Sequence, residues 1–94
     1  MAKQLHVELV AVEKKVWTGE AEMVIARTTE GELGVLPGHA PLLGQLAEPG
    51  QVRITLGGGE QVAYDVAGGF VSVTAEGVTI LAEEAVPATA SATH

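Results

Sequence analysis

QVRITLGGGEQVAYDV, residues 51–66, is the stretch of the chain that decides its fold. Polar and apolar residues alternate from Gln51 to Leu56, and this period of two is typical of a strand with one buried and one solvated face. Three glycines then lead into a second alternating run, Glu60–Val66. A phosphate-binding glycine loop would continue into a helix instead. Two alternating runs joined by glycines therefore predict a β-hairpin.

Further strands are predicted on both sides of this hairpin. Short runs rich in aliphatic and β-branched residues are separated by turn-forming residues about every 8 to 12 positions, with no helical period between them. The expected strands are Leu5–Val12, Glu20–Thr28, Leu42–Ala47 and Val78–Ala82, and the expected turns are Thr18-Gly19, Glu48-Pro49-Gly50 and Thr74–Gly77. This pattern predicts an all-β protein with a flattened antiparallel β-sandwich or barrel.

The chain is expected to form a single domain, which suits its 94 residues. Gly68 and Gly69 should form a bulge or a close backbone crossing, because glycine reaches conformations closed to other residues. Phe70, which follows them, is expected to lie in the core. Near its end the sequence has small residues without an apolar period. We therefore predict a β-sandwich domain over residues 1–86 and a flexible C-terminal tail over residues 87–94.

Glycines, prolines and a histidine interrupt the strand pattern in EGELGVLPGHAPLL, residues 30–43. Such a segment is expected neither to continue as a helix nor to lie flat as a strand. It is predicted to be a shaped corner. Its aliphatic side chains would lie either beneath the turn or toward a partner protein.

The chain is acidic, with twelve Asp and Glu against five Lys and Arg and a formal charge of -7. This charge repels nucleic acid and anionic lipid surfaces, so neither nucleic-acid binding nor direct lipid insertion is expected. Without cysteine there is no disulfide and no thiolate metal site. No apolar run is long enough for a spanning helix and the polar start is no signal peptide, so a soluble intracellular protein is expected.

The sequence carries no recognisable catalytic constellation. Its three histidines, His6, His39 and His94, lack the spacing of a zinc motif. Carboxylate pairs occur at Glu20 with Glu22, at Glu30 with Glu32 and at Glu83 with Glu84, and a solvated turn does not drive two pKa values apart as acid-base catalysis requires. We expect no catalytic residue, no metal and no cofactor. His39 is either a satisfied turn residue or an interface contact.

Residues 30–43 closely resemble a segment of the epsilon subunit family of bacterial F-type ATP synthase, the counterpart of the mitochondrial delta subunit. Further matches follow in family order and extend the resemblance over residues 3–86. They are Leu5–Val10, Trp17–Glu20, Pro49-Gly50, Gly68–Val71 with Val73, and Val78–Glu83.

The resemblance implies a flattened sandwich of about ten strands on the central stalk of the synthase. It implies a rotor component with no chemistry of its own, which packs on the gamma subunit and stands on the ring of c subunits. By the resemblance, the c-ring contacts are Glu30, Gly31, Glu32 and Leu33, and the gamma contacts are His39, Ala40, Pro41, Leu42 and Leu43. Glu32 matches the acidic residue that faces the polar c-subunit loop. An acidic turn can meet basic loop residues, and an apolar corner can be covered by a partner.

Family members usually continue into two antiparallel helices that bind ATP or inhibit hydrolysis in several bacteria. The sequence up to His94 has neither a helical period nor the arginine-bearing motif of that nucleotide site. The resemblance therefore assigns neither inhibition nor ATP binding to this chain.

The expected function is that of a rotor subunit that links gamma to the c ring and supports the coupling of proton transport to ATP synthesis. It would lie peripherally on the cytoplasmic face of the bacterial plasma membrane. The alternative is a free-standing β-sandwich that binds a small ligand or peptide as a monomer. The first hypothesis predicts that Glu32→Lys and Leu42→Asp leave the domain folded but weaken its assembly with gamma or the c ring.

Overall fold

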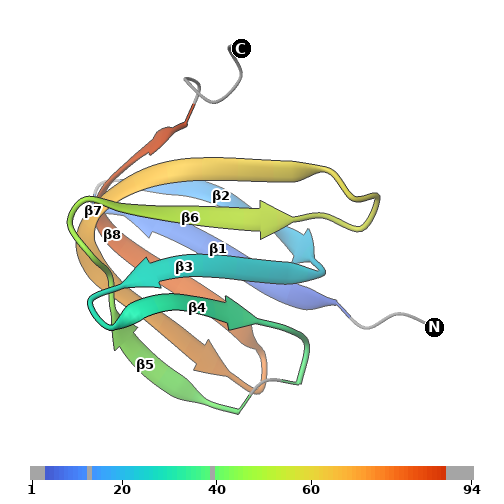
Figure 1. The fold of residues 1–94 in the computed structure, drawn as a ribbon. Coiled ribbons are helices and arrows are strands. Elements are labelled where there is room, and N and C mark those ends of the chain that lie inside the picture. The colour runs from blue at the N-terminus through green and yellow to red at the C-terminus, as the bar shows by residue number, and fades with distance from the viewer. Residues whose placement is uncertain (1–3, 13, 39, 89–94) are drawn as a thin grey trace.

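The structure is a computed structural model that describes residues 4–12, 14–38 and 40–88, and every described element is a strand (Figure 1). The all-β prediction is confirmed, although these residues form eight strands rather than about ten. The strands are β1 (Leu5–Ala11), β2 (Lys14–Ala21), β3 (Met23–Thr28), β4 (Gly31–Val35), β5 (Leu42–Gln45), β6 (Gly50–Thr55), β7 (Gln61–Thr74) and β8 (Gly77–Pro87). The described part of the chain contains no helix that could span a membrane.

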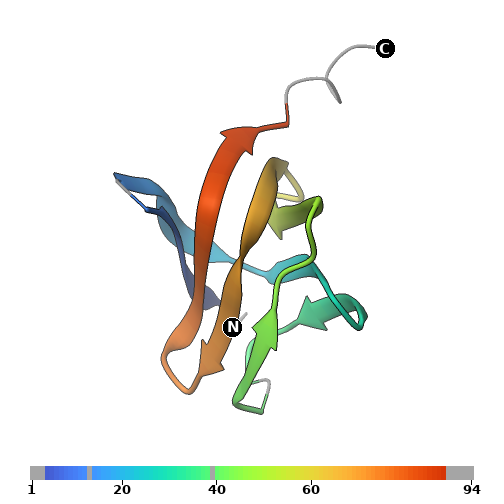
Figure 2. The same cartoon turned by 90° about the vertical axis from the view of Figure 1, so that its left-hand side faces the viewer.

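The strands form one continuous sheet in the order β2-β1-β8-β7-β6-β3-β4, and β5 pairs with β7. The long strand β7 holds the two layers together, because its first half pairs with β6 and its second half with β5 along the same edge. Figure 2 shows β7 beside β8, with β5 along the lower part of β7. In Figure 1, β3, β4 and β6 lie in front of β1, β2 and β8.

The hairpin predicted from residues 51–66 is present as β6 and β7. Its strands pair from Gly50 opposite Val66 to Thr55 opposite Gln61, and the Leu56 amide donates to the Glu60 carbonyl at 2.7 Å. The reversal predicted before it is present too, and the Glu48-Pro49 peptide bond is cis.

One strand pair departs from the predicted antiparallel arrangement. β1 and β8 run parallel, with Val7 opposite Val78 and Ala11 opposite Ala82. Every other pair of named strands is antiparallel. β8 must run against β7 because a short turn joins them, and β1 lies on the other edge of β8 in the same direction as β8.

The core lies between the layers and consists of aliphatic side chains from alternate positions of the strands. No polar or charged residue among those described is buried. The buried core residues are Leu5, Val7, Leu9, Ala21, Val24, Ala26, Val35, Leu46, Val52, Ile54, Val66, Val71, Val73, Val78, Ile80 and Ala82. Burial of these apolar groups is the main stabilising contribution that the described residues offer.

The turn predicted at Thr18-Gly19 is wrong, because both residues lie within β2 and pair with β1. The chain bends instead at Glu22, between β2 and β3. Gly19 instead has a packing role, since a Cβ atom placed there would lie 3.0 Å from the ring of Trp17. The missing side chain lets the indole pack closely over the strand.

The close crossing predicted at Gly68-Gly69 is confirmed. Gly69 has a φ of 115°, and a Cβ atom there would overlap the carbonyl oxygen of Leu81 on β8. The prediction that Phe70 lies in the core is wrong, because its side chain is 49% exposed. Val71 occupies the inward position after the crossing, so Phe70 points outward.

β8 is longer than predicted and continues to Pro87 instead of ending at Ala82. Its last residues pair with the first half of β7, with Pro87 opposite Tyr64 and Glu84 opposite Ala67. Glu83 and Glu84 are solvent-facing charges on a paired strand. Residues 89–94 of the predicted tail lie outside the described residues.

Candidate interaction site

The acidic turn, residues Glu30–Leu33, joins β3 to β4 and lies on the surface. The hydroxyl of Thr28 makes two hydrogen bonds with the backbone of this turn. This hydroxyl donates to the Gly31 carbonyl at 2.7 Å and accepts from the Glu30 amide at 3.2 Å. Such local bonds fix the turn backbone and leave the Glu30 side chain exposed.

The expectation that residues 30–43 form a corner without strand structure is wrong for Gly31–Val35, which forms β4 and pairs with β3. The strand predicted at Leu42–Ala47 is present as β5, Leu42–Gln45. Glycine in β4 weakens a strand but does not prevent pairing, and Val35 packs fully buried beneath it. Only the connection between these strands is a corner.

Glu32 and Leu33 lie on opposite faces of β4. Leu33 packs against the core. Glu32 points outward, and the Arg53 guanidinium on β6 donates from Nη2 to its Oε2 at 3.0 Å. The carboxylate is therefore exposed and held by an ion pair at the same time.

The residues predicted to face gamma do not lie on one surface. Ala40 and Pro41 are exposed, and Leu42 packs partly buried against the core. Leu43 points the other way and is 69% exposed. His39 lies outside the described residues. Only part of this segment is therefore available to a partner.

The structure brings the acidic turn and the beginning of β5 together. Both line an open hollow of about 460 Å³, whose walls are residues 28–33 and 42–45. Ala40 and Pro41 instead border a second hollow of about 340 Å³, which also contacts Pro37, Gly38 and the β7–β8 turn. The two predicted contact segments are thus neighbours, although Ala40 and Pro41 of the second segment line a different hollow.

An apolar patch that the sequence reading missed lies on the outer face of β1, β5, β7 and β8. Phe70 stands opposite Leu81, and Leu81 stands opposite Val10. Leu43 is diagonal to Phe70, because Leu43 faces Ser72 and Phe70 faces Gln45. Leu81 is 52% exposed. We call Val10, Leu43, Phe70 and Leu81 the apolar patch. The outward positions of alternating strands are the signal that could have revealed it.

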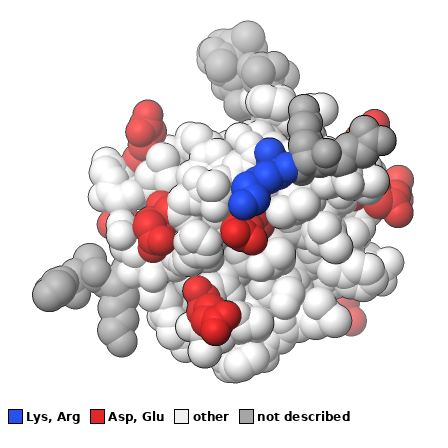
Figure 3. Space-filling view, turned by 180° about the vertical axis from the view of Figure 1, so that it is seen from behind, with Lys and Arg blue, Asp and Glu red and all other residues white. Residues whose placement is uncertain are grey.

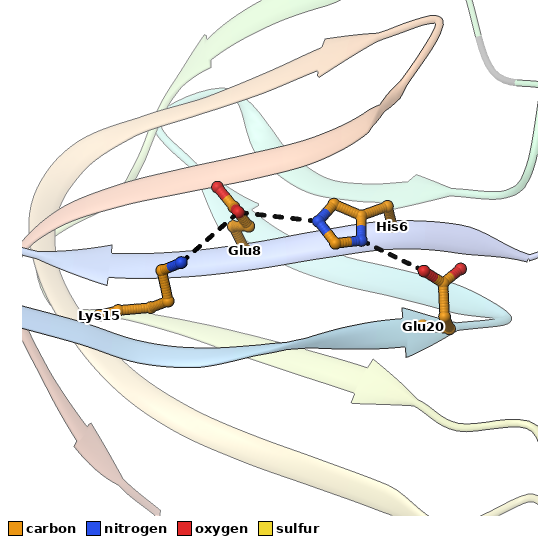
Figure 4. A network of polar contacts seen from close by, with 4 residues as sticks. All are labelled: His6, Glu8, Lys15 and Glu20. Atoms are coloured by element: carbon orange, nitrogen blue, oxygen red, sulfur yellow. Dashed lines mark hydrogen bonds and ion pairs between the residues drawn. The ribbon is translucent and has the colours of Figure 1, made fainter.

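A polar network lies on the neighbouring part of this face, across β1 and β2 (Figure 4). His6 lies between two carboxylates, with Nδ1 at 3.2 Å from Glu20 and Nε2 at 3.6 Å from Glu8. The hydrogen bond with Glu20, and then the charge of both carboxylates, raises the pKa of the His6 imidazole above its ordinary value of 6.5. Lys15 contacts Glu8 at 3.8 Å.

The described surface shows no group that suggests metal binding. No set of three or more His, Asp or Glu residues within the described ranges is arranged to hold a metal ion.

Seen from behind, the surface is largely uncharged, with acidic side chains scattered around a short basic stretch (Figure 3). An exposed apolar area with a polar rim is typical of a site that binds another protein.

Fold and surface together define a small β-sandwich with an apolar patch and an acidic turn exposed on its surface. A family model described as "ATP synthase, Delta/Epsilon chain, beta-sandwich domain" matches residues 4–88. The chain therefore belongs to the delta/epsilon chain family of ATP synthase. The family predicted from the sequence is thereby confirmed.

Relatives from bacteria agree with this assignment. The chain is 60% identical over 82 residues to the ATP synthase epsilon chain of Rhodococcus jostii (strain RHA1), covering 87% of this chain and 67% of the relative. It is 58% identical over 81 residues to the epsilon chain of Frankia casuarinae, covering 86% of this chain and 94% of the relative.

Solved structures share the fold. The structure superposes with a TM-score of 0.84 and 32% identity on a chain from the Euglena gracilis mitochondrial ATP synthase, OSCP/F1/c-ring. The superposition covers 89% of this chain and about half of the Euglena chain, 53%. A chain from the Tetrahymena thermophila mitochondrial ATP synthase central stalk and c ring has the same fold, with a TM-score of 0.74 at 21% identity and coverages of 89% and 66%.

Proposed function

We propose that this chain is the central-stalk rotor subunit of an F-type ATP synthase, where it links the gamma subunit to the ring of c subunits. Its membership of the delta/epsilon chain family supports this role. The chain would take no chemical step itself. It would support the coupling of proton transport to ATP synthesis from the cytoplasmic face of the bacterial plasma membrane.

The observation that carries the proposal is the apolar patch, because contiguous apolar side chains exposed on one face are typical of a surface that another protein covers. Phe70 and Leu81 form its centre and are each about half exposed, at 49% and 52%. Leu43 extends it to the segment predicted to face gamma. We assign the apolar patch to gamma.

The acidic turn is assigned to the c ring. Glu30 and Glu32 are exposed at the β3–β4 turn, and Arg53 neutralises only the second of them. A carboxylate at such a turn attracts basic loop residues across a polar interface. Of the gamma contacts predicted from the sequence, Leu43 fits this assignment best, and Leu42 serves the core instead.

A rigid body between two partners must transmit torque without bending. The two layers share the continuous strand β7, so the gamma-facing and ring-facing surfaces belong to one hydrogen-bonded sheet. The acidic turn lies on the edge hairpin β3–β4, which β6 connects to β7. Such pairing gives the subunit the stiffness that the role requires.

Binding of the full chain to purified gamma tests the proposal. We expect wild type to form a complex in size-exclusion chromatography and Phe70→Gln with Leu81→Gln to weaken it at least tenfold, because both substitutions place amides in an apolar interface. The matched control is Thr79→Gln, on the outer face of β8 but outside the apolar patch. If wild type did not bind gamma, or if the double variant bound as tightly as wild type, the assignment of the apolar patch would be wrong.

A further inference from the structure

The ion pair between Arg53 and Glu32 does not join cross-strand neighbours. The residue directly opposite Glu32 is Arg27 on β3, whereas Arg53 stands opposite Ile25, one strand further along the sheet. The Arg53 side chain thus reaches diagonally across β3 to place Nη2 at 3.0 Å from Glu32 Oε2.

Arg27 is the nearer arginine in register, yet the described residues give it no ion pair. Its side chain is exposed at the end of β3. The chain therefore has two arginines on the outer face of the same layer, and the one that lies nearer to the acidic turn is not the one that binds Glu32. Only one of them holds the carboxylate.

We propose that Arg53 is a positioning residue, which fixes the Glu32 carboxylate for a basic donor of the c-ring loop. This inference rests on the proposed function, because it needs Glu32 to contact the ring. The guanidinium holds Oε2 and leaves Oε1 free to accept a hydrogen bond from the partner. A side chain that is ordered before binding loses less conformational entropy on binding.

Glu30 provides the contrast within the same turn. Its amide is fixed by Thr28, but its carboxylate has no ion pair among the described residues. Glu30 can attract a basic loop from a distance, whereas Glu32 offers an acceptor in a defined direction. The two carboxylates of the acidic turn thus have different roles.

Charge alone makes the opposite prediction about Arg53. A positive group beside the contact repels a basic loop, so its removal would strengthen binding if only long-range attraction mattered. Removing a positioning residue weakens binding instead. The sign of the effect therefore separates the two explanations, and Arg27 offers a substitution with the same change of charge on the same face.

The test measures the affinity of the full chain for a purified complex of gamma with the c ring in detergent. The variants are Glu32→Gln, Arg53→Gln, Arg53→Lys and Arg27→Gln. We expect Arg53→Gln to weaken binding about fivefold, the order expected when one side chain must be newly ordered. Arg53→Lys should recover part of the loss, and Arg27→Gln should leave the affinity equal or slightly tighter. In the Glu32→Gln background, Arg53→Gln should have no further effect.

The outcomes are distinguishable. If wild type did not bind the complex, the proposed function and this inference would both fail. If wild type bound and Arg53→Gln bound as tightly as Arg27→Gln or more tightly, only the positioning role would be overturned. A thermal melt of each variant checks folding, and an exposed ion pair contributes little to stability, so all four variants should stay folded.

Discussion

Leu42 and Leu43 are adjacent in sequence but lie on opposite faces of β5. Leu42 packs against the core, and Leu43 is 69% exposed. The alternation of a strand separates a stabilising leucine from one that is free to contact a partner.

This separation predicts different results for the same substitution at the two positions. Leu42→Asp should destabilise the fold by about 2 kcal/mol, because it removes apolar burial and brings a charge against the core. Leu43→Asp should change stability by no more than about 0.5 kcal/mol but weaken binding to gamma. Urea unfolding and a gamma binding assay measure the two effects. The structure thus revises the prediction that Leu42→Asp leaves the domain folded, and equal unfolding midpoints for the two variants would contradict the revision.

Gly69 should be among the glycines most sensitive to substitution. Gly69→Ala should cost roughly 3 kcal/mol, because the residue has positive φ and its Cβ atom would overlap the Leu81 carbonyl oxygen. Gly34→Ala is the control, since no atom lies within 4 Å of a Cβ placed there and its φ is not positive. Thermal unfolding of both variants gives the comparison. A melting temperature of Gly69→Ala close to that of Gly34→Ala would show that β7 and β8 do not cross so closely.

The packing of Trp17 on Gly19 can be followed by fluorescence, because the chain has a single tryptophan. Gly19→Ala should push the indole away from the strand, change its emission maximum and lower stability by about 1 kcal/mol. Gly58→Ala, in the β6–β7 turn with nothing within 4 Å of the added atom, should leave the emission unchanged. The prediction fails if both variants give the emission spectrum of wild type.

The pKa of His6 should depend more on Glu20 than on Glu8. The hydrogen bond that the His6 ring donates to Glu20 is the largest cause of the raised pKa, and the effects of the Glu8 contact and of the Glu8 charge are smaller. NMR titration of the His6 ring should therefore show a larger fall in pKa for Glu20→Gln than for Glu8→Gln. Equal titration midpoints in the two variants would contradict the hydrogen-bond geometry.

The raised pKa of His6 also sets a direction for stability. The imidazole binds its proton more tightly in the folded chain, so its contribution is fully present below about pH 6.5 and is lost as pH rises through the folded pKa. The difference in urea midpoint between wild type and His6→Gln should shrink over that range. A difference that grew with pH would reverse the sign of this linkage.

The sequence predicted the features that depend on local pattern. Alternation predicted the β6–β7 hairpin, the glycine pair predicted the close crossing at Gly69, and the lack of a helical period predicted an all-β fold. Prediction from the sequence failed where the same type of residue occurs in two different structural settings. Gly19 was interpreted as a turn residue, but it makes room for Trp17. The prediction that Phe70 lies in the core is wrong because the neighbouring Val71 takes the inward position of the strand.

The candidate site could be predicted only in part. The acidic turn is contiguous in sequence, and its assignment to the c ring comes from the resemblance to the family and stays a prediction. The apolar patch is assembled from four strands, so its members are neighbours only through the register of β1, β5, β7 and β8. The Arg53–Glu32 ion pair crosses an intervening strand and leaves no mark in the spacing of the two residues.

The parallel pairing of β1 with β8 has a consequence for how the chain is made. Val7, near the beginning of the chain, finds its partner in Val78, near the end of the described sheet. The β1–β2 hairpin can form early during synthesis on the ribosome, but one edge of β1 then waits until β8 has emerged. Contacts between residues so far apart in sequence form slowly, and an unpaired strand edge invites aggregation. The edge of β1 that pairs with β8 therefore closes late in the folding of the nascent domain.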